Sequence, residues 1–280
     1  MSKDIKFILG TAQLGKKYGR YSDNKIDNEE CNNIMKFCSK NNINTFDTAQ
    51  NYGNAESILS NYNNINIITK ININNNIVDS VQKSLDNLKT DKIDILLLHD
   101  FDDFKNDKIV NELIELKTNG IINKLGVSIY TVHEALYIFN SKYNDHFEII
   151  QLPINILDNQ WDNIEFLYYA TNKIIYTRSI FLQGIILNEY NTWPVQNELS
   201  LNIYNKIEEC CTINNITKIE LCFNYIKTLS WVNGIVIGID NTNQLIHNFN
   251  IFNKPNKNIN FSLIKNNKIP EKLIDPRKWN

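Results

Sequence analysis

The sequence predicts an α/β protein folded as a (β/α)8 barrel, the TIM-barrel architecture, with a single domain over residues 1–280. Two observations lead to this prediction. Eight short segments are mostly continuous apolar runs without alternation, which is typical of parallel strands covered on both faces. Helical patterns lie between these segments, and alternating strands and helices favour right-handed crossovers that close into a barrel. The length agrees, since such barrels need about 250 residues.

The elements follow in a regular order along the chain. The expected strands are residues 7–10, 45–47, 65–70, 93–99, 124–128, 149–152, 174–178 and 234–238. Three of the intervening helices repeat apolar residues at a period near 3.6. Their apolar positions are Cys31, Ile34, Met35 and Cys38; Val78, Val81, Leu85 and Leu88; and Val132, Ala135, Leu136 and Phe139. Further helices are expected within residues 199–228, and the tail at 253–280 is expected to fold back on the barrel.

Composition excludes several classes of function. Charged residues make up 21% of the chain with a net charge of -2, so the basic surface of a nucleic-acid binder is not expected. The longest apolar runs, such as residues 93–98, are shorter than the roughly 20 residues that cross a bilayer, and residues 1–7 lack the apolar core of a leader. We expect a soluble, cytoplasmic protein with a small-molecule partner. Of its five cysteines, Cys31 and Cys38 share one face of a predicted helix and are expected to be buried free thiols. The oligomeric state is left open.

Three consecutive predicted strands lead into polar residues of different chemistry. Asp47 and Tyr52 follow the second strand, Lys70 ends the third and His99 ends the fourth. In a barrel of parallel strands, such residues meet at the carboxyl-terminal rim. An ammonium beside a phenol is expected to lower the phenol pKa, which would prepare Tyr52 to donate a proton, with Asp47 as counter-ion of Lys70. His99 would orient an incoming oxygen. This set lacks an obvious nucleophile, so it suits protonation of a carbonyl oxygen while a cofactor hydride attacks the carbon.

The motifs F-D-T-A-Q-N-Y-G-N-A-E, I-T-K and L-L-L-H, in this order and at these intervals, resemble the aldo-keto reductase superfamily. The resemblance covers residues 9–249 and implies a catalytic tetrad of Asp47, Tyr52, Lys70 and His99, with Tyr52 as general acid. It also implies NAD(P)H-dependent reduction of an aldehyde or ketone. Taken singly, each of these residues equally fits a structural role; their joint arrangement favours catalysis. No cluster with metal-ligand spacing is found, so we expect no metal site.

The same resemblance implies where the cofactor lies. Ser128 and Gln151 would bind the nicotinamide carboxamide, although Ile129 stands where the family often has Asn. Arg178 replaces the aromatic ring that many relatives stack on the nicotinamide, and its alternative role is to hold a pyrophosphate or a substrate anion. The predicted cofactor-binding residues are Gly10, Thr11, Ser128, Gln151, Arg178, Ser179, Gly238, Asn241, Gln244 and Asn248.

The segment V-I-G-I-D-N-T-N-Q resembles the eighth strand and the start of the following helix, where backbone N–H groups favour a phosphate. Many NADPH-dependent relatives place Lys or Arg where this chain has Gly238 and Gln244. The family implies that NADP(H) is the favoured cofactor, with NAD(H) as the alternative. The long loop after residue 178 supplies most of the expected substrate pocket. The predicted pocket residues are Tyr18, Phe181, Tyr190 and Trp193.

The substrate class follows only from the resemblance. L-G-T-A-Q-L-G-x-x-Y-G and the ending D-P-R-K-W look similar to bacterial reductases associated with sugar or sugar-nucleotide metabolism, so a keto- or aldo-sugar derivative is favoured. Two alternatives from other classes stay open. One is a cofactor-binding regulatory subunit on the same fold. The other is a Schiff-base aldolase that uses Lys70 as nucleophile.

Overall fold

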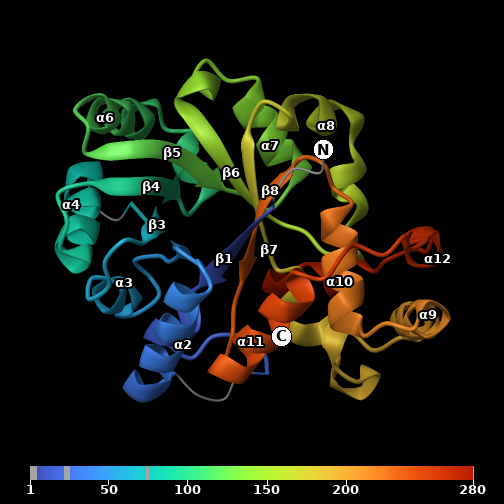
Figure 1. Cartoon of the computed structure of the whole chain (residues 1–280). Helices are drawn as coiled ribbons and strands as arrows, with labels where there is room; N and C mark the ends of the chain where they lie inside the picture. Colours follow the sequence, from blue (N-terminus) through green and yellow to red (C-terminus); the bar gives the residue numbers. More distant parts are fainter. Residues whose placement is uncertain (1–4, 22–25, 74–75, 280) are drawn as a thin grey trace.

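The eight predicted strands close into a parallel barrel in the computed structural model, which describes residues 5–21, 26–73 and 76–279. Each strand pairs with the next, and β1 pairs with β8, so the (β/α)8 prediction is confirmed (Figure 1). The strands are β1 Lys6–Gly10, β2 Thr45–Asp47, β3 Asn66–Ile71, β4 Ile93–Leu98, β5 Ile122–Ser128, β6 Phe147–Pro153, β7 Ile174–Arg178 and β8 Val232–Ile237. The first four residues, part of the segment on which a missing leader was predicted, lie outside the described ranges.

Three strands begin two residues before their predicted starts. Residues Ile122, Phe147 and Val232 pair with the neighbouring strand at the amino-terminal end of the barrel, so backbone pairing extends β5, β6 and β8. The longer helices are α2 Asn28–Lys40, α3 Ala55–Leu59, α4 Ile77–Leu88, α6 Asp107–Thr118, α7 Val132–Phe139, α8 Ile164–Ala170, α9 Glu198–Asn214, α10 Lys218–Lys227 and α11 Thr242–Phe252. The four-residue helices are α1 Ala12–Gly15, α5 Phe101–Phe104, α12 Ser262–Lys265 and α13 Glu271–Ile274. The 3-10 turns are η1 Asn144–His146, η2 Asn159–Asp162, η3 Leu182–Leu187, η4 Tyr190–Thr192 and η5 Pro276–Lys278.

Helix α4 begins where the local sequence supplies a capping residue, but one of its predicted core positions was wrong. The Asn76 side chain accepts a hydrogen bond from the Asp79 N–H and caps the helix, which stabilises it by about 1 kcal/mol. Val78 is 55% exposed and does not join the core, because a turn that begins at residue 77 carries it to the solvent side. The buried residues of α4 are Ile77, Ser80, Val81, Ser84 and Leu88.

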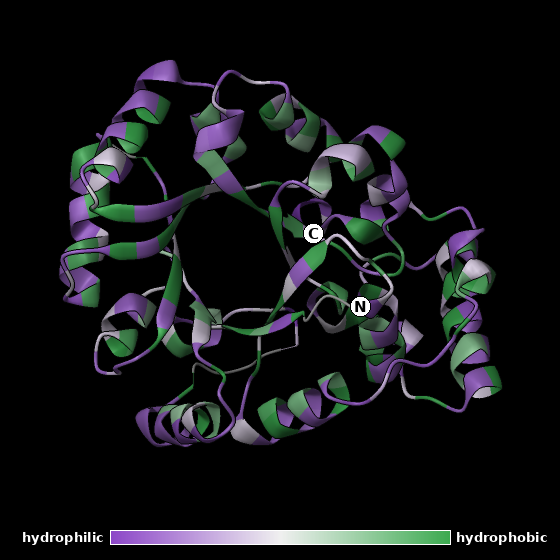
Figure 2. Cartoon of the chain, turned by 45° about the horizontal axis from the view of Figure 1, so that its top comes forward, coloured by the Kyte–Doolittle hydropathy of each residue, from purple (hydrophilic) through white to green (hydrophobic). Residues whose placement is uncertain are grey.

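Two apolar layers hold the barrel together. The larger lies between the strands and the surrounding helices, which Figure 2 shows as a ring with both hydrophilic and hydrophobic sides. The smaller fills the barrel interior, where buried side chains from different strands meet. Its members are Ile8, Ile68, Ile95, Leu97, Ile149 and Tyr176. The five cysteines are free and buried, which confirms the prediction for Cys31 and Cys38. Within the described ranges, no helix combines the length and the apolar character needed to span a membrane.

Side chains alternate between the two faces of a strand, and this alternation places the site residues at the barrel rim. Side chains two residues apart in a strand point to the same face. Ile68, Ile149 and Tyr176 belong to the interior layer, and the residues two positions later are Lys70, Gln151 and Arg178. Along β3, β6 and β7, the barrel therefore changes from an apolar interior to a polar rim within one alternation of the strand.

Candidate active site

A buried ion pair joins strands β2 and β3 at this rim. The Lys70 Nζ lies 2.6 Å from the Asp47 Oδ1 and donates a second hydrogen bond, of 2.8 Å, to the Thr48 carbonyl. Both side chains are almost fully buried. Burial lowers the pKa of Lys70, and the Asp47 carboxylate opposes that shift. A desolvated pair of this kind needs every remaining polar atom to be satisfied.

Gln151 supplies the next contact from β6. Its Nε2 donates a 2.6 Å hydrogen bond to the Asp47 Oδ2, so this carboxylate is held from two sides. Within the described residues, the Gln151 Oε1 is buried and has no hydrogen-bond partner. Ser128 is buried and pairs with Gln151 in the register of β5 and β6. The amide oxygen is thus available to a donor such as a carboxamide, while the amide nitrogen is already used by Asp47.

Tyr52 lies among cationic and aromatic groups. The Lys70 Nζ is 5.2 Å from its ring centroid, the Lys16 Nζ is 5.4 Å away, and the His99 ring meets it edge-on at 6.1 Å. Burial, followed by the Asp47 carboxylate, raises the pKa of Tyr52, while Arg178 lowers it. The expectation that Lys70 would lower this pKa is therefore wrong. The physical reason is that burial removes the hydration of the phenolate, and this effect, together with the Asp47 carboxylate, outweighs the lowering by Arg178.

A glycine fixes the backbone of Tyr52. A Cβ atom on Gly15 would lie 1.5 Å from the Tyr52 carbonyl oxygen, so no other residue fits without moving the catalytic loop. This contact lies at the end of the segment 10–15. At the start of this segment, the Thr11 hydroxyl donates a 2.9 Å hydrogen bond to the Asp47 carbonyl.

His99 borders the same group from β4. Burial, then the positive charges of Lys70, Arg178 and Lys16, lower its pKa to about 3. Its Nδ1 is buried and has no partner among the described residues. A neutral imidazole has one donor and one acceptor nitrogen, so it is able to orient a carbonyl oxygen by hydrogen bonding.

A cavity of about 790 Å³ extends from Asp47 and Tyr52 to the start of α11. Its volume lies within the range of ligand pockets. Ser128 and Gln151 are not among its lining residues. The predicted cofactor and pocket residues that line it are Gly10, Thr11, Tyr18, Arg178, Ser179, Phe181, Gly238, Asn241, Gln244 and Asn248.

Two predicted pocket residues lie elsewhere. Trp193 is 2% exposed and packs with Tyr190 and Tyr204 at ring distances of 5.9 and 5.7 Å. Neither Tyr190 nor Trp193 lines the cavity, so their assignment to the pocket was wrong. Both rings are instead used to anchor the long loop to α9, because burying aromatic surface stabilises the loop more than exposing it.

The start of α11, where a phosphate was expected, is occupied by side chains of the protein itself. The Asn241 side chain accepts a 2.9 Å hydrogen bond from the Gln244 N–H, and the Gln244 side-chain amide donates to the Asp240 carboxylate at 3.1 Å. The Thr242 N–H donates to the carboxylate of Glu30, from α2. Glu30 lies 212 residues from Thr242 in the sequence, so no motif near α11 could indicate this contact. Part of the expected anion site therefore holds an anion already.

Arg178 stacks on a ring that the sequence did not single out. Its guanidinium carbon lies 4.4 Å from the Tyr130 ring centroid, and its Nη2 donates a 3.2 Å hydrogen bond to the Ile129 carbonyl. Ile129, which stands where the family often has Asn, thus provides a backbone carbonyl that accepts a hydrogen bond from Arg178.

The model of the Aldo/keto reductase family matches residues 6–266. The chain belongs to the aldo/keto reductase family. It is an oxidoreductase of this class, and the family uses nicotinamide cofactors. No curated protein has significant sequence similarity to it.

Two solved structures show the same fold. An aldo-keto reductase from Bacillus halodurans, in its holo form, shares 18% identity with a TM-score of 0.72 over 97% of this chain and 95% of that one. The glycerol dehydrogenase from Gluconobacter oxydans shares 19% identity with a TM-score of 0.68 over 90% and 87% of the two chains. At these identities the similarity shows the fold alone.

Proposed function

We propose that this aldo-keto reductase reduces an aldehyde or ketone to the alcohol with NADPH or NADH. The observation that carries the proposal is the placement of Tyr52 beside a buried Lys70–Asp47 pair and against His99, at the edge of the 790 Å³ cavity. These four residues are the proposed catalytic set.

Bound reduced nicotinamide would supply a hydride to the carbonyl carbon. The Tyr52 phenol gives its proton to the carbonyl oxygen, and the raised pKa keeps this phenol protonated at neutral pH. The Lys70 ammonium, 5.2 Å from the ring, stabilises the phenolate that remains. Asp47 and Gln151 hold this ammonium in place, and neutral His99 orients the carbonyl oxygen by a hydrogen bond.

The residues present fit a nicotinamide cofactor. The unpaired Gln151 oxygen suits the carboxamide N–H group, and the cavity lined by Arg178, Ser179, Gly238 and Asn241 would hold the rest of the dinucleotide. Family membership favours NADP(H), but Glu30 and Asp240 stand where a cation would hold the 2'-phosphate. We therefore propose modest discrimination between NADPH and NADH.

For the substrate we propose a keto- or aldo-sugar derivative. The cavity combines amide side chains of Gln13, Gln183 and Asn188 with the aromatic residues Tyr18 and Phe181. Amide groups both donate and accept hydrogen bonds, as hydroxyl groups require. The similarity in fold to a glycerol dehydrogenase is in line with a polyhydroxylated substrate.

Turnover with a carbonyl panel tests the proposal. Oxidation of NADPH or NADH should occur with at least one sugar-derived aldehyde or ketone, and the Tyr52→Phe variant should lose it. Tight nucleotide binding with no turnover on the whole panel would favour the regulatory subunit. A borohydride-trapped adduct on Lys70 would favour the aldolase; against that alternative, the Lys70 ammonium is engaged by Asp47 and the Thr48 carbonyl.

A further inference from the structure

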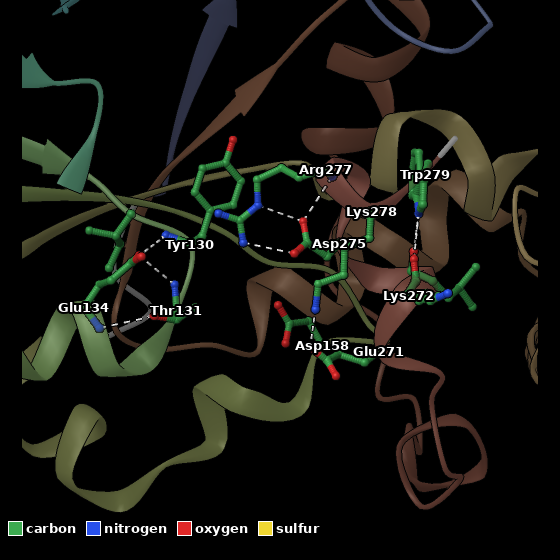
Figure 3. Close-up of polar contacts among 12 residues, drawn as sticks. Tyr130, Thr131, Glu134, Asp158, Glu271, Lys272, Asp275, Arg277, Lys278 and Trp279 are labelled. Atoms are coloured by element: carbon green, nitrogen blue, oxygen red, sulfur yellow. Dashed lines mark hydrogen bonds and ion pairs between the residues drawn. The ribbon is translucent and has the colours of Figure 1, made fainter. Parts of the chain in front are cut away.

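The carboxyl-terminal tail reaches the rim of the barrel through an aromatic stack. The Arg277 guanidinium carbon lies 3.9 Å from the Tyr130 ring centroid, and the Arg178 guanidinium carbon lies 4.4 Å from the same centroid. Figure 3 shows Arg277 against the ring, with the tail residues packed around it. A single tyrosine therefore connects the tail with a residue that lines the catalytic cavity.

The tail holds Arg277 in place against the ring by contacts of its own. Asp275 accepts two hydrogen bonds from Arg277, of 2.9 Å at Nε and 3.0 Å at Nη2. The tail is anchored further by the Trp279 indole, which donates to the Lys272 carbonyl at 2.8 Å, and by the Lys278–Glu271 ion pair (Figure 3).

Tyr130 itself is fixed from the opposite side. The Glu134 carboxylate accepts hydrogen bonds from the backbone N–H groups of Tyr130 and Thr131, at 2.5 and 3.0 Å (Figure 3). The Gln160 side chain donates to the Tyr130 carbonyl at 3.3 Å. With its backbone held on both sides, the ring is a fixed surface against which two guanidinium groups lie.

Arg178 has unused binding capacity. A guanidinium has five N–H donors, and one of them, on Nη2, donates to the Ile129 carbonyl. Among the residues that the structure describes, no carboxylate forms an ion pair with this half-buried cation. Arg178 also lines both the catalytic cavity and a second cavity of about 400 Å³ beside the tail. A partly desolvated guanidinium facing a cavity favours binding of a carboxylate or a phosphate.

We propose that the Arg178–Tyr130–Arg277 stack is a positioning device for an anion-binding site. Resting on the proposed function, Arg178 binds anionic oxygens next to Tyr52, either the pyrophosphate of the dinucleotide or a carboxylate or phosphate of the substrate. Tyr130 and Arg277 are positioning residues that hold the guanidinium plane in place. The tail thus contributes to ligand binding without touching the ligand.

The test compares four variants of the full chain. Tyr130→Leu and Arg277→Ala remove the stack, and Tyr130→Phe retains the ring. Lys272→Ala is the matched control, because the Lys272 side chain is exposed in the same tail and Trp279 contacts its backbone carbonyl. The dissociation constant of NADH is measured by protein fluorescence. The KM values of 4-carboxybenzaldehyde and benzaldehyde are compared, since these two substrates differ only in the carboxylate. Binding of inorganic pyrophosphate is measured by calorimetry.

The two sources of the anion give different results. If Arg178 binds the pyrophosphate, the Leu and Ala variants should weaken NADH and pyrophosphate binding by about 3- to 30-fold, with recovery in Tyr130→Phe. If it binds a substrate anion, NADH binding stays unchanged and only the KM of the carboxylated aldehyde rises, by a similar factor.

Other outcomes overturn the proposal. Variants that match Lys272→Ala in every measurement would show that the stack only packs the tail. A wild-type chain that binds pyrophosphate but neither dinucleotide would overturn the proposed function, and the stack would then be judged on pyrophosphate alone. A wild-type chain that binds neither pyrophosphate nor dinucleotide, with no preference between the two aldehydes, would overturn the inference itself.

Discussion

The Gln151 side-chain nitrogen lies 2.6 Å from the Asp47 Oδ2, although the two residues are 104 positions apart in the sequence. This contact crosses from β6 to β2 and completes the support of the Lys70–Asp47 pair. It also sets the orientation of the Gln151 amide, whose oxygen is left for a ligand.

Replacement of Gln151 by Leu should therefore affect both stability and catalysis. One oxygen of the buried Asp47 would lose its partner, which costs about 1–3 kcal/mol of unfolding free energy. Denaturant unfolding and kcat report the two effects. Gln50→Leu is the control, because the Gln50 amide bonds to Ser80 and Ser84 outside the catalytic group. Equal kcat values for the two variants would refute the role of Gln151 in holding the pair.

The Tyr52→Phe variant should lose carbonyl reduction by roughly 10²- to 10⁴-fold, because the phenolic proton is needed in the transition state. Its dissociation constant for NADPH or NADH should stay close to the wild-type value. Tyr18→Phe, whose ring lies 6.0 Å from Tyr52, should retain turnover. A Tyr52→Phe enzyme with most of its kcat would mean that another group donates the proton.

Because the pKa of Tyr52 is raised, the rate of carbonyl reduction should not decrease on the alkaline side of its pH profile through ionisation of this residue. Because the ordinary pKa is 10.0 and the protonated phenol is the donor, reduction should not fall below pH 10 through ionisation of Tyr52. Any earlier fall should follow Lys70, whose pKa is lowered by burial. Tyrosinate absorbance of the wild type and of Tyr52→Phe should coincide up to pH 10. A wild-type signal below that pH that is missing in the variant would show that a cation lowers this pKa.

His99 should make the fold less stable in acid. Its pKa is about 3 in the folded chain and 6.5 ordinarily, so between these values the unfolded chain binds a proton that the folded chain does not. The stability from neutral His99 is present above pH 6.5 and falls towards pH 3, by up to about 1.4 kcal/mol per pH unit. Urea unfolding of His99→Gln should show a smaller slope in this window, and the exposed His133→Gln should not. A difference in stability between His99→Gln and wild type that is independent of pH would contradict this reading.

Glu30 should reduce the affinity for a 2'-phosphate. Glu30→Gln keeps an oxygen for the Thr242 N–H but removes the charge, so the NADPH-to-NADH affinity ratio should rise by roughly three- to tenfold, equivalent to about 1 kcal/mol. Gln244→Arg should raise the ratio further and make NADPH binding more sensitive to salt. Glu29→Gln is the matched control, because Glu29 is exposed on the same helix. Equal ratios in Glu30→Gln and Glu29→Gln would place the phosphate elsewhere, as would a wild-type preference for NADPH of about a thousandfold.

The local sequence patterns were sufficient to predict the barrel and the order of the proposed catalytic residues along it. Buried parallel strands and amphipathic helices have local patterns, and each of Asp47, Lys70 and His99 stands at or just after the end of such a strand. Because the carboxyl ends of parallel strands meet at one rim, the convergence of these residues follows from the order of elements alone.

The groups that surround these residues could not be predicted in the same way, because they come together only when the chain folds. Burial and the Asp47 carboxylate raise the Tyr52 pKa, an effect that depends on distances across the barrel and not on sequence spacing. Three further contacts join segments that are far apart in the chain. Trp193 packs in a buried aromatic cluster, the Glu30 carboxylate of α2 binds the start of α11, and Arg277 stacks on Tyr130. Such contacts have no periodic sequence pattern that would predict them, because they form where loops and a tail without repeating patterns meet on the folded barrel.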